Sequence, residues 1–175
     1  MKINTKYPLL TNAFDHKDIK AGIKTIRSKM ITISNNTRKF EKKFAKSIGA
    51  NYAVMTNSGS SANLLAFSAL SNPLNKLGLR KGDEILIPAV CWSTSLWPII
   101  QNNFKPIFVD VNINNFNIDL KKLAKKITKK TKAIIITHIY GFSVDMRKIL
   151  QIAKIKNIKI IEDAAEMIGQ TYNKK

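Results

Sequence analysis

The sequence is poor in cysteine, arginine and acidic residues, and it contains no long apolar run. Its 175 residues include a single cysteine, Cys91, so a disulfide cannot form within the chain. No apolar stretch approaches the roughly 18 residues of a membrane-spanning helix, and residues 1–12 lack the apolar centre of a secretory signal peptide. We therefore expect a cytoplasmic protein with no membrane partner.

The scarcity of acidic residues gives the chain a formal net charge of +19, from 30 lysines and arginines against 11 aspartates and glutamates. Only four of the basic residues are arginine, the side chain that contacts phosphates and bases through paired hydrogen bonds. The densest group of lysines falls at residues 121–132. Because net charge alone argues weakly for nucleic-acid binding, we expect no nucleic-acid partner but a preference for acidic small molecules.

Five short apolar runs, rich in isoleucine and valine, alternate with segments whose apolar residues recur at helical spacing. Most of these runs are not interrupted by polar residues, which is typical of parallel strands covered on both faces. The pattern predicts an α/β fold, a three-layer sandwich of helices around a mainly parallel sheet. The predicted strands are residues 52–56, 84–88, 106–110, 133–137 and 158–162.

The alternation divides the chain into two predicted parts. Residues 1–33 form a lead-in segment with a helix that Asp15 can cap. Residues 34–175 carry the strands of a domain. The chain stops soon after the fifth predicted strand, which would leave an edge or a face of the sheet uncovered. We therefore expect a partial domain, or one that needs a partner.

A glycine and three serines follow the first predicted strand, at residues 58–61. Where a strand turns into a helix, the first N–H groups of the helix have no internal partner and can bind a phosphate. Gly59 would let the backbone approach the anion, and Ser60 and Ser61 can add hydroxyl donors. Serines also cap ordinary helices, so the pattern leaves both interpretations open.

Two further side chains follow predicted strands at the edge where ligands of parallel sheets bind. Trp92 comes after the second strand, and Asp163 comes at the end of the fifth. Taken separately, the tryptophan could belong to the core and the aspartate could form a turn. Together with the serine turn, they suit a phosphorylated pyridine such as pyridoxal phosphate, whose ring needs a face to stack on and an acid at its nitrogen.

The remaining candidate groups are weaker. His138 follows the fourth strand and either lies near a ligand or satisfies a neighbouring carbonyl, and we favour the second interpretation. Cys91 has no base beside it in the sequence, which argues against a nucleophilic role. The sequence shows no spacing of metal ligands. We therefore expect no metal site.

Seven short motifs strengthen this interpretation. They are residues 39–44 (KFEKKF), 57–62 (NSGSSA), 82–89 (GDEILIPA), 106–111 (PIFVDV), 131–134 (TKAI), 138–141 (HIYG) and 162–166 (EDAAE). In this order they resemble the DegT/DnrJ/EryC1/StrS sugar aminotransferases, which are pyridoxal-phosphate enzymes of the aspartate aminotransferase fold (fold type I). The resemblance runs from about residue 7 to residue 175 and implies an incomplete large domain, without its C-terminal part and without the small domain.

The resemblance implies a role for each matching residue. Gly59, Ser60 and Ser61 correspond to the phosphate-binding turn, Trp92 to the aromatic residue that stacks on the cofactor ring, and Asp163 to the partner of the pyridine nitrogen. Glu166 occupies a position where the family often has glutamine in contact with the ring hydroxyl. The Schiff-base lysine of the family belongs to a segment beyond residue 175, so we assign no catalytic residue.

Three functions stay open. The favoured one is transamination of a nucleotide-linked keto-sugar in amino-sugar and surface polysaccharide biosynthesis, with glutamate as amino donor, in a full-length homodimer. The stretch 57–65 also resembles the sugar 3-dehydrases, which use pyridoxamine phosphate and have histidine in place of the lysine. The third is a fragment without catalytic activity of its own.

Overall fold

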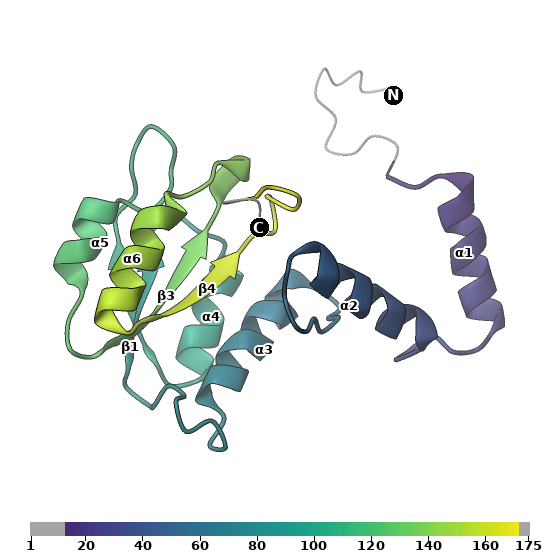
Figure 1. Cartoon of the computed structure of the whole chain (residues 1–175), viewed down its shortest axis with the longest axis horizontal. Coiled ribbons are helices and arrows are strands. Elements are labelled where there is room, and N and C mark those ends of the chain that lie inside the picture. The colour runs from purple at the N-terminus through teal and green to yellow at the C-terminus, as the bar shows by residue number, and fades with distance from the viewer. Residues whose placement is uncertain (1–12, 172–175) are drawn as a thin grey trace. The chain divides into compact units, whose positions relative to one another are not determined.

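The computed structural model describes residues 13–171 (Figure 1). The chain forms two compact units, Met1–Met55 and Thr56–Lys175, which we describe separately. This division falls later in the chain than the predicted boundary after residue 33. The assignment of residues 34–175 to a cofactor-binding domain therefore stays a prediction.

The first unit contains the helices α1 (His16–Arg27) and α2 (Asn35–Ser47). Asp15 caps α1 as expected, since its carboxylate accepts hydrogen bonds from the N–H groups of Lys17 and Asp18. Ser34 caps α2, which ends just before Gly49, whose φ of +69° suits a residue without a side chain. No residue of α1 is buried, so the apolar stripe of this helix lies exposed within its unit.

The strand predicted at residues 52–56 is wrong. Tyr52 and Val54 are 89% and 67% exposed, and the segment is extended without belonging to a sheet. The N–H group of Met55 donates to Oε1 of Glu41, 2.8 Å away on α2, rather than to another strand. Apolar sequence alone does not make a strand, because a strand needs a neighbour for its backbone groups, and within residues 13–171 none pairs with this segment.

The second unit is built on a four-stranded parallel sheet, as predicted. The strand order is β2-β1-β3-β4, so consecutive strands are joined by helical crossovers. The central strands β1 and β3 are almost wholly buried, which explains their uninterrupted apolar sequences. The bounds are β1 (Glu84–Pro88), β2 (Lys105–Val109), β3 (Thr131–Thr137) and β4 (Lys159–Asp163).

Helices cover both faces of the sheet and confirm the three-layer arrangement (Figure 1). Successive side chains of a strand point to opposite faces, so Ile85 and Ile87 belong to one core and Leu86 to the other. The first core packs against α3 (Gly59–Ser71) and α4 (Ser93–Gln101). The second packs against α5 (Leu120–Lys126) and α6 (Met146–Lys156).

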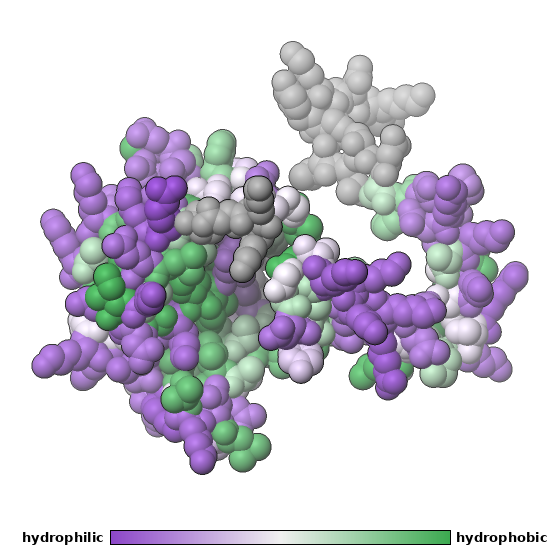
Figure 2. Space-filling view, viewed as in Figure 1, coloured by the Kyte–Doolittle hydropathy of each residue, from purple (hydrophilic) through white to green (hydrophobic). Residues whose placement is uncertain are grey.

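Strand β4 forms one edge of the sheet in the described residues. Figure 2 shows apolar surface between α6 and α3. A strand at an edge leaves one row of N–H and C=O groups without a ladder partner. Among the described residues, no helix is both long and apolar enough to cross a membrane.

Candidate functional site

The carboxylate of Asp163, at the end of β4, is held by three hydrogen bonds. Its Oδ2 accepts from Nδ2 of Asn63 on α3 at 3.0 Å and from Oγ of Ser95 on α4 at 3.2 Å. Its Oδ1 accepts from the N–H group of Ala165 at 3.3 Å. Asn63 is 9% exposed and Ser95 is fully buried, so these donors are fixed by the packing around them. The carboxylate therefore has a defined orientation.

These bonds bring three predicted site segments to one place. Asn63 is the fifth residue of α3, about 6 Å along the helix axis from Gly59 at a rise of 1.5 Å per residue. Ser95 is the third residue of α4, for which Trp92 is the N-cap. The starts of α3 and α4 thus lie beside the end of β4. This is the carboxyl edge of the parallel sheet, where α/β proteins bind ligands.

The serine turn at residues 58–61 contains both an ordinary helix cap and a possible phosphate site, the two interpretations that the sequence left open. Ser58 is an ordinary N-cap, since its Oγ accepts a hydrogen bond from the N–H group of Ser61 at 3.2 Å. The N–H groups of Gly59 and Ser60 have no acceptor among residues 13–171. A Cβ added at Gly59 would meet nothing within 4 Å, so local packing does not require glycine there. Two free donors and an open approach fit a phosphate group.

Trp92 does not belong to the core. Its side chain is 74% exposed at the start of α4. The neighbouring Cys91 is half-buried, and burial, together with the negative charge of Asp163, raises the pKa of its thiol. A raised pKa leaves little thiolate at neutral pH, which agrees with the prediction that Cys91 is not a nucleophile.

His138 is buried and fully bonded by the protein. Its Nδ1 accepts from the N–H group of Val144 at 3.2 Å, so the proton of the neutral ring lies on Nε2, which donates to Glu162 at 3.0 Å. This hydrogen bond lowers the pKa of Glu162, against the opposing effect of partial burial. The partners of the His138 ring are therefore an N–H group and a carboxylate, rather than the neighbouring carbonyl that the sequence analysis favoured.

Glu166 joins the loops that follow β3 and β4. One oxygen of its carboxylate, Oε2, accepts a hydrogen bond from the N–H group of Tyr140, a residue with a φ of +53°. Its backbone oxygen lies 3.3 Å from the place that a Cβ on Gly141 would occupy. Its other oxygen, Oε1, has no partner among the described residues. Whether Glu166 contacts a ring hydroxyl stays a prediction.

Asn63 and Ser95 are the two residues of this site that the sequence reasoning missed. Each lies one helical turn before a fully buried apolar residue, Phe67 on α3 and Ile99 on α4. A polar residue on the inward stripe of an apolar helix is the signal that could have found them, because such a group needs a buried partner.

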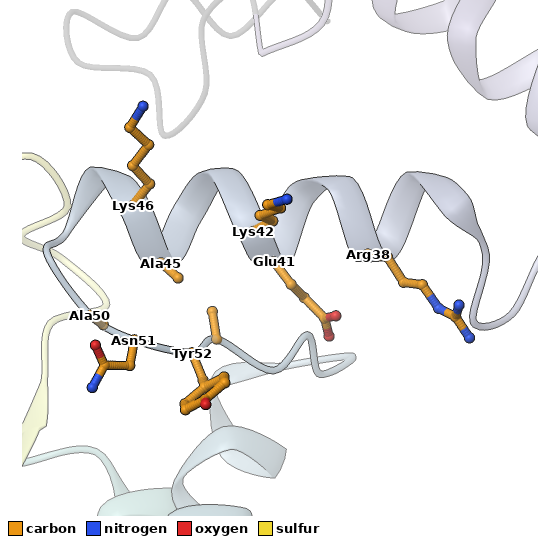
Figure 3. A pocket seen from close by; sticks show the side chains of 9 residues that line it. Arg38, Glu41, Lys42, Ala45, Lys46, Ala50, Asn51 and Tyr52 are labelled. Atoms are coloured by element: carbon orange, nitrogen blue, oxygen red, sulfur yellow. The ribbon is translucent and has the colours of Figure 1, made fainter.

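One hollow of the described residues belongs to the first unit (Figure 3). It measures about 590 Å³ and lies open between α2 and the extended segment that follows it. None of the predicted site residues lines it. Nor do the described residues bring together three His, Cys, Asp or Glu side chains that could hold a metal. The lining residues are Arg38, Glu41, Lys42, Ala45, Lys46, Ala50, Asn51, Tyr52 and Ala53.

Comparison with known proteins identifies the family. The sequence profile of the DegT/DnrJ/EryC1/StrS aminotransferase family matches residues 12–175. The chain belongs to this family. Both the resemblance found in the sequence and the expected fold are thereby confirmed.

Two relatives represent different reactions within the family. A GDP-4-keto-6-deoxy-D-mannose 3-dehydratase of Escherichia coli O55:H7 is 40% identical over 97% of this chain. A dTDP-3-amino-3,6-dideoxy-alpha-D-galactopyranose transaminase of Aneurinibacillus thermoaerophilus is 41% identical over 78% of it. The chain covers 43% and 36% of these proteins, so it spans less than half their length.

A solved structure gives the same result in three dimensions. The E. coli GDP-4-keto-6-deoxy-D-mannose-3-dehydratase with bound hydrated pyridoxal phosphate superposes with a TM-score of 0.90 at 40% identity. The match covers 97% of this chain and 43% of the dehydratase. Pyridoxal phosphate, the cofactor predicted from the sequence, is therefore found in a family member of the same fold.

Proposed function

We propose that this chain is the cofactor-binding part of a vitamin B6-dependent enzyme that acts on a nucleotide-linked keto-sugar. The observation that carries the proposal is the fixed carboxylate of Asp163 beside the starts of α3 and α4. The free N–H groups of Gly59 and Ser60 and the exposed face of Trp92 support it. When bound, the cofactor supplies an electron sink for bonds at the substrate carbon attached to it.

Each residue of the proposed cofactor site has a distinct role. The start of α3 binds the phosphate through backbone donors and the hydroxyl of Ser60. Trp92 covers one face of the ring and excludes water from it. Asp163 accepts a charge-assisted hydrogen bond from the N–H group of the ring nitrogen and so keeps the nitrogen protonated. Glu166 orients the ring through its hydroxyl.

Transamination and 3-dehydration are the two reactions that the proposal admits. The first needs an amino donor such as glutamate and a lysine that binds the cofactor, and the second has histidine at that position. The similarity to the 3-dehydratase extends over 97% of the chain, against 78% for the transaminase, which favours dehydration with pyridoxamine phosphate. In a protein of the relatives' full length, the residue at this position decides between the two reactions.

Binding of pyridoxamine 5′-phosphate to the 175-residue chain tests the proposal. This form of the cofactor is preferable to the aldehyde, which would react with the many surface lysines. Calorimetric titration should show saturable binding that Asp163→Asn and Trp92→Ala each weaken at least about threefold, roughly the effect of one lost hydrogen bond or ring contact. Trp97→Ala is the matched control, because Trp97 is also exposed on α4 but has no proposed role.

Gly59→Ala separates binding from stability. Since a Cβ there meets nothing and φ is not positive, the variant should be as stable as the parent protein. It should nevertheless bind the phosphate less tightly if the anion approaches the backbone of α3.

Equal weakening by Trp97→Ala and Trp92→Ala would contradict the proposed site. Absence of binding by the folded parent chain would favour a fragment without activity of its own.

A further inference from the structure

The partners of Asp163 differ from those of the ion-paired carboxylates among the described residues. Asp110 is paired with Lys122, and Asp145 with Lys148. None of the ion pairs formed among residues 13–171 includes Asp163, although basic residues outnumber acidic ones 30 to 11. In their place, two uncharged side chains donate to it. Its negative charge is therefore oriented without being neutralised by a lysine or arginine.

The two donors share one oxygen of the carboxylate. An ionised carboxylate offers about four acceptor positions, two on each oxygen. Asn63 and Ser95 occupy both positions on Oδ2, whereas Oδ1 accepts only the N–H group of Ala165. One position on Oδ1 thus stays open. A donor arriving from outside the protein would find this position already oriented.

Burying the polar side chains of Asn63 and Ser95 costs free energy of folding. Asn63 and Ser95 take inward positions of α3 and α4, where apolar residues would pack at least as well. Asparagine is also a poor residue for a helix interior, because its side chain competes for backbone hydrogen bonds. If these positions served only to stabilise the fold, apolar residues at 63 and 95 and a solvent-exposed aspartate at 163 would be sufficient.

We propose that Asn63 and Ser95 are positioning residues that hold Oδ2 of Asp163, so that Oδ1 receives the N–H group of a protonated ring nitrogen. This inference rests on the proposed function and extends it to two residues of α3 and α4. Neutral donors fix the direction of the carboxylate and leave its full charge to stabilise the cationic ring. An ion-paired aspartate would attract the ring proton less strongly.

The experiment measures pyridoxamine 5′-phosphate binding to the whole chain, and the pH at which the bound ring nitrogen loses its proton, followed by ultraviolet absorbance. Ser95→Ala and Asn63→Leu should each weaken binding about three- to tenfold. Both should also lower the pH of ring deprotonation, an effect that loss of packing alone would not produce. The matched control is Ser71→Ala, which removes a different hydrogen bond of α3, from Ser71 to Asn102 at 2.8 Å.

Each outcome decides one of the two proposals. If the parent chain binds and both variants match it in affinity and in ring titration, the positioning role is wrong and the proposed function stands. If the folded parent chain does not bind, the proposed function fails, and this inference fails with it. Should Asn63→Leu not fold, Ser95→Ala decides alone, since it removes a single oxygen atom. A change of equal size in Ser71→Ala would also overturn the positioning role.

Discussion

Replacing Glu162 tests whether the hydrogen bonds of His138 hold its ring in one tautomer. Because Nδ1 of His138 accepts from Val144, the ring must donate from Nε2, and Glu162 is the acceptor. Glu162→Ala removes this acceptor and leaves a buried N–H group without a partner. Glu162→Gln keeps an acceptor oxygen at the same place. The two variants thus differ in one hydrogen bond while both lack the carboxylate charge.

The expected loss follows from the burial of the histidine. Its side chain has no exposed surface, so the N–H group stays unpaired unless water fills the space of the Glu162 side chain, which is 44% exposed. An unpaired buried donor costs about 1–3 kcal/mol, whereas exchanging one acceptor for another should cost less than about 1 kcal/mol. Against a typical total of about 5–15 kcal/mol, the Glu162→Ala loss is readily measured.

The pH dependence provides a second comparison. The hydrogen bond from His138 lowers the pKa of Glu162 in the folded protein below its ordinary value of 4.5. A carboxyl with a lowered pKa stabilises the fold above its unfolded pKa, and this contribution is lost as the pH falls through the folded pKa. The glutamine side chain does not titrate. The stability advantage of the parent protein over Glu162→Gln should therefore shrink between pH 6 and pH 3.

Urea unfolding followed by circular dichroism measures both effects. The free energy of unfolding at pH 7 should rank the parent protein first, Glu162→Gln close behind it, and Glu162→Ala clearly last. If the two variants are equally stable, or if the difference between parent and Glu162→Gln is the same at every pH, Glu162 does not hold His138 as described.

Two further predictions concern α3 and the environment of Cys91. Phe67→Ala leaves a cavity at a fully buried site beside Phe104 and should lower the free energy of unfolding in urea by about 3–5 kcal/mol. The control Leu64→Ala, on the exposed side of the same helix, should lower it by less than about 1 kcal/mol. Similar losses in the two variants would contradict the packing of α3. Asp163→Asn should lower the pKa of the Cys91 thiol and speed its alkylation by iodoacetamide at pH 8, because a neighbouring negative charge disappears. With one cysteine in the chain the assay has no background, and an unchanged rate would show that the carboxylate does not act on the thiol.

The sequence alone predicted the strands of the second unit correctly, but it predicted a strand at residues 52–56 where none forms. Strands β1 to β4 agree with their predicted ranges to within two residues at each end, because their apolar residues pack in the two cores between the sheet and its helices. The segment 52–56 has the same composition but no neighbouring strand among the described residues. Strand formation depends on that neighbour, which a local pattern cannot reveal.

The candidate site shows a similar division. Asp163 and Trp92 follow apolar runs, and position after a strand was enough to select them. Asn63 and Ser95 act on Asp163 across 100 and 68 positions of sequence. Single polar residues inside helices have no periodicity of their own. Their importance emerges only when folding brings α3, α4 and β4 together.

The high net charge decides which binding experiments are informative. A chain of formal charge +19 attracts every phosphate compound, so affinity for a phosphate does not by itself locate a site. That attraction is weakened by salt and depends little on the rest of the ligand. A ring nitrogen on Asp163, by contrast, distinguishes pyridoxamine phosphate from an aliphatic amine phosphate of equal charge. The difference in affinity between these two ligands should therefore persist at high salt, and it should disappear in Asp163→Asn.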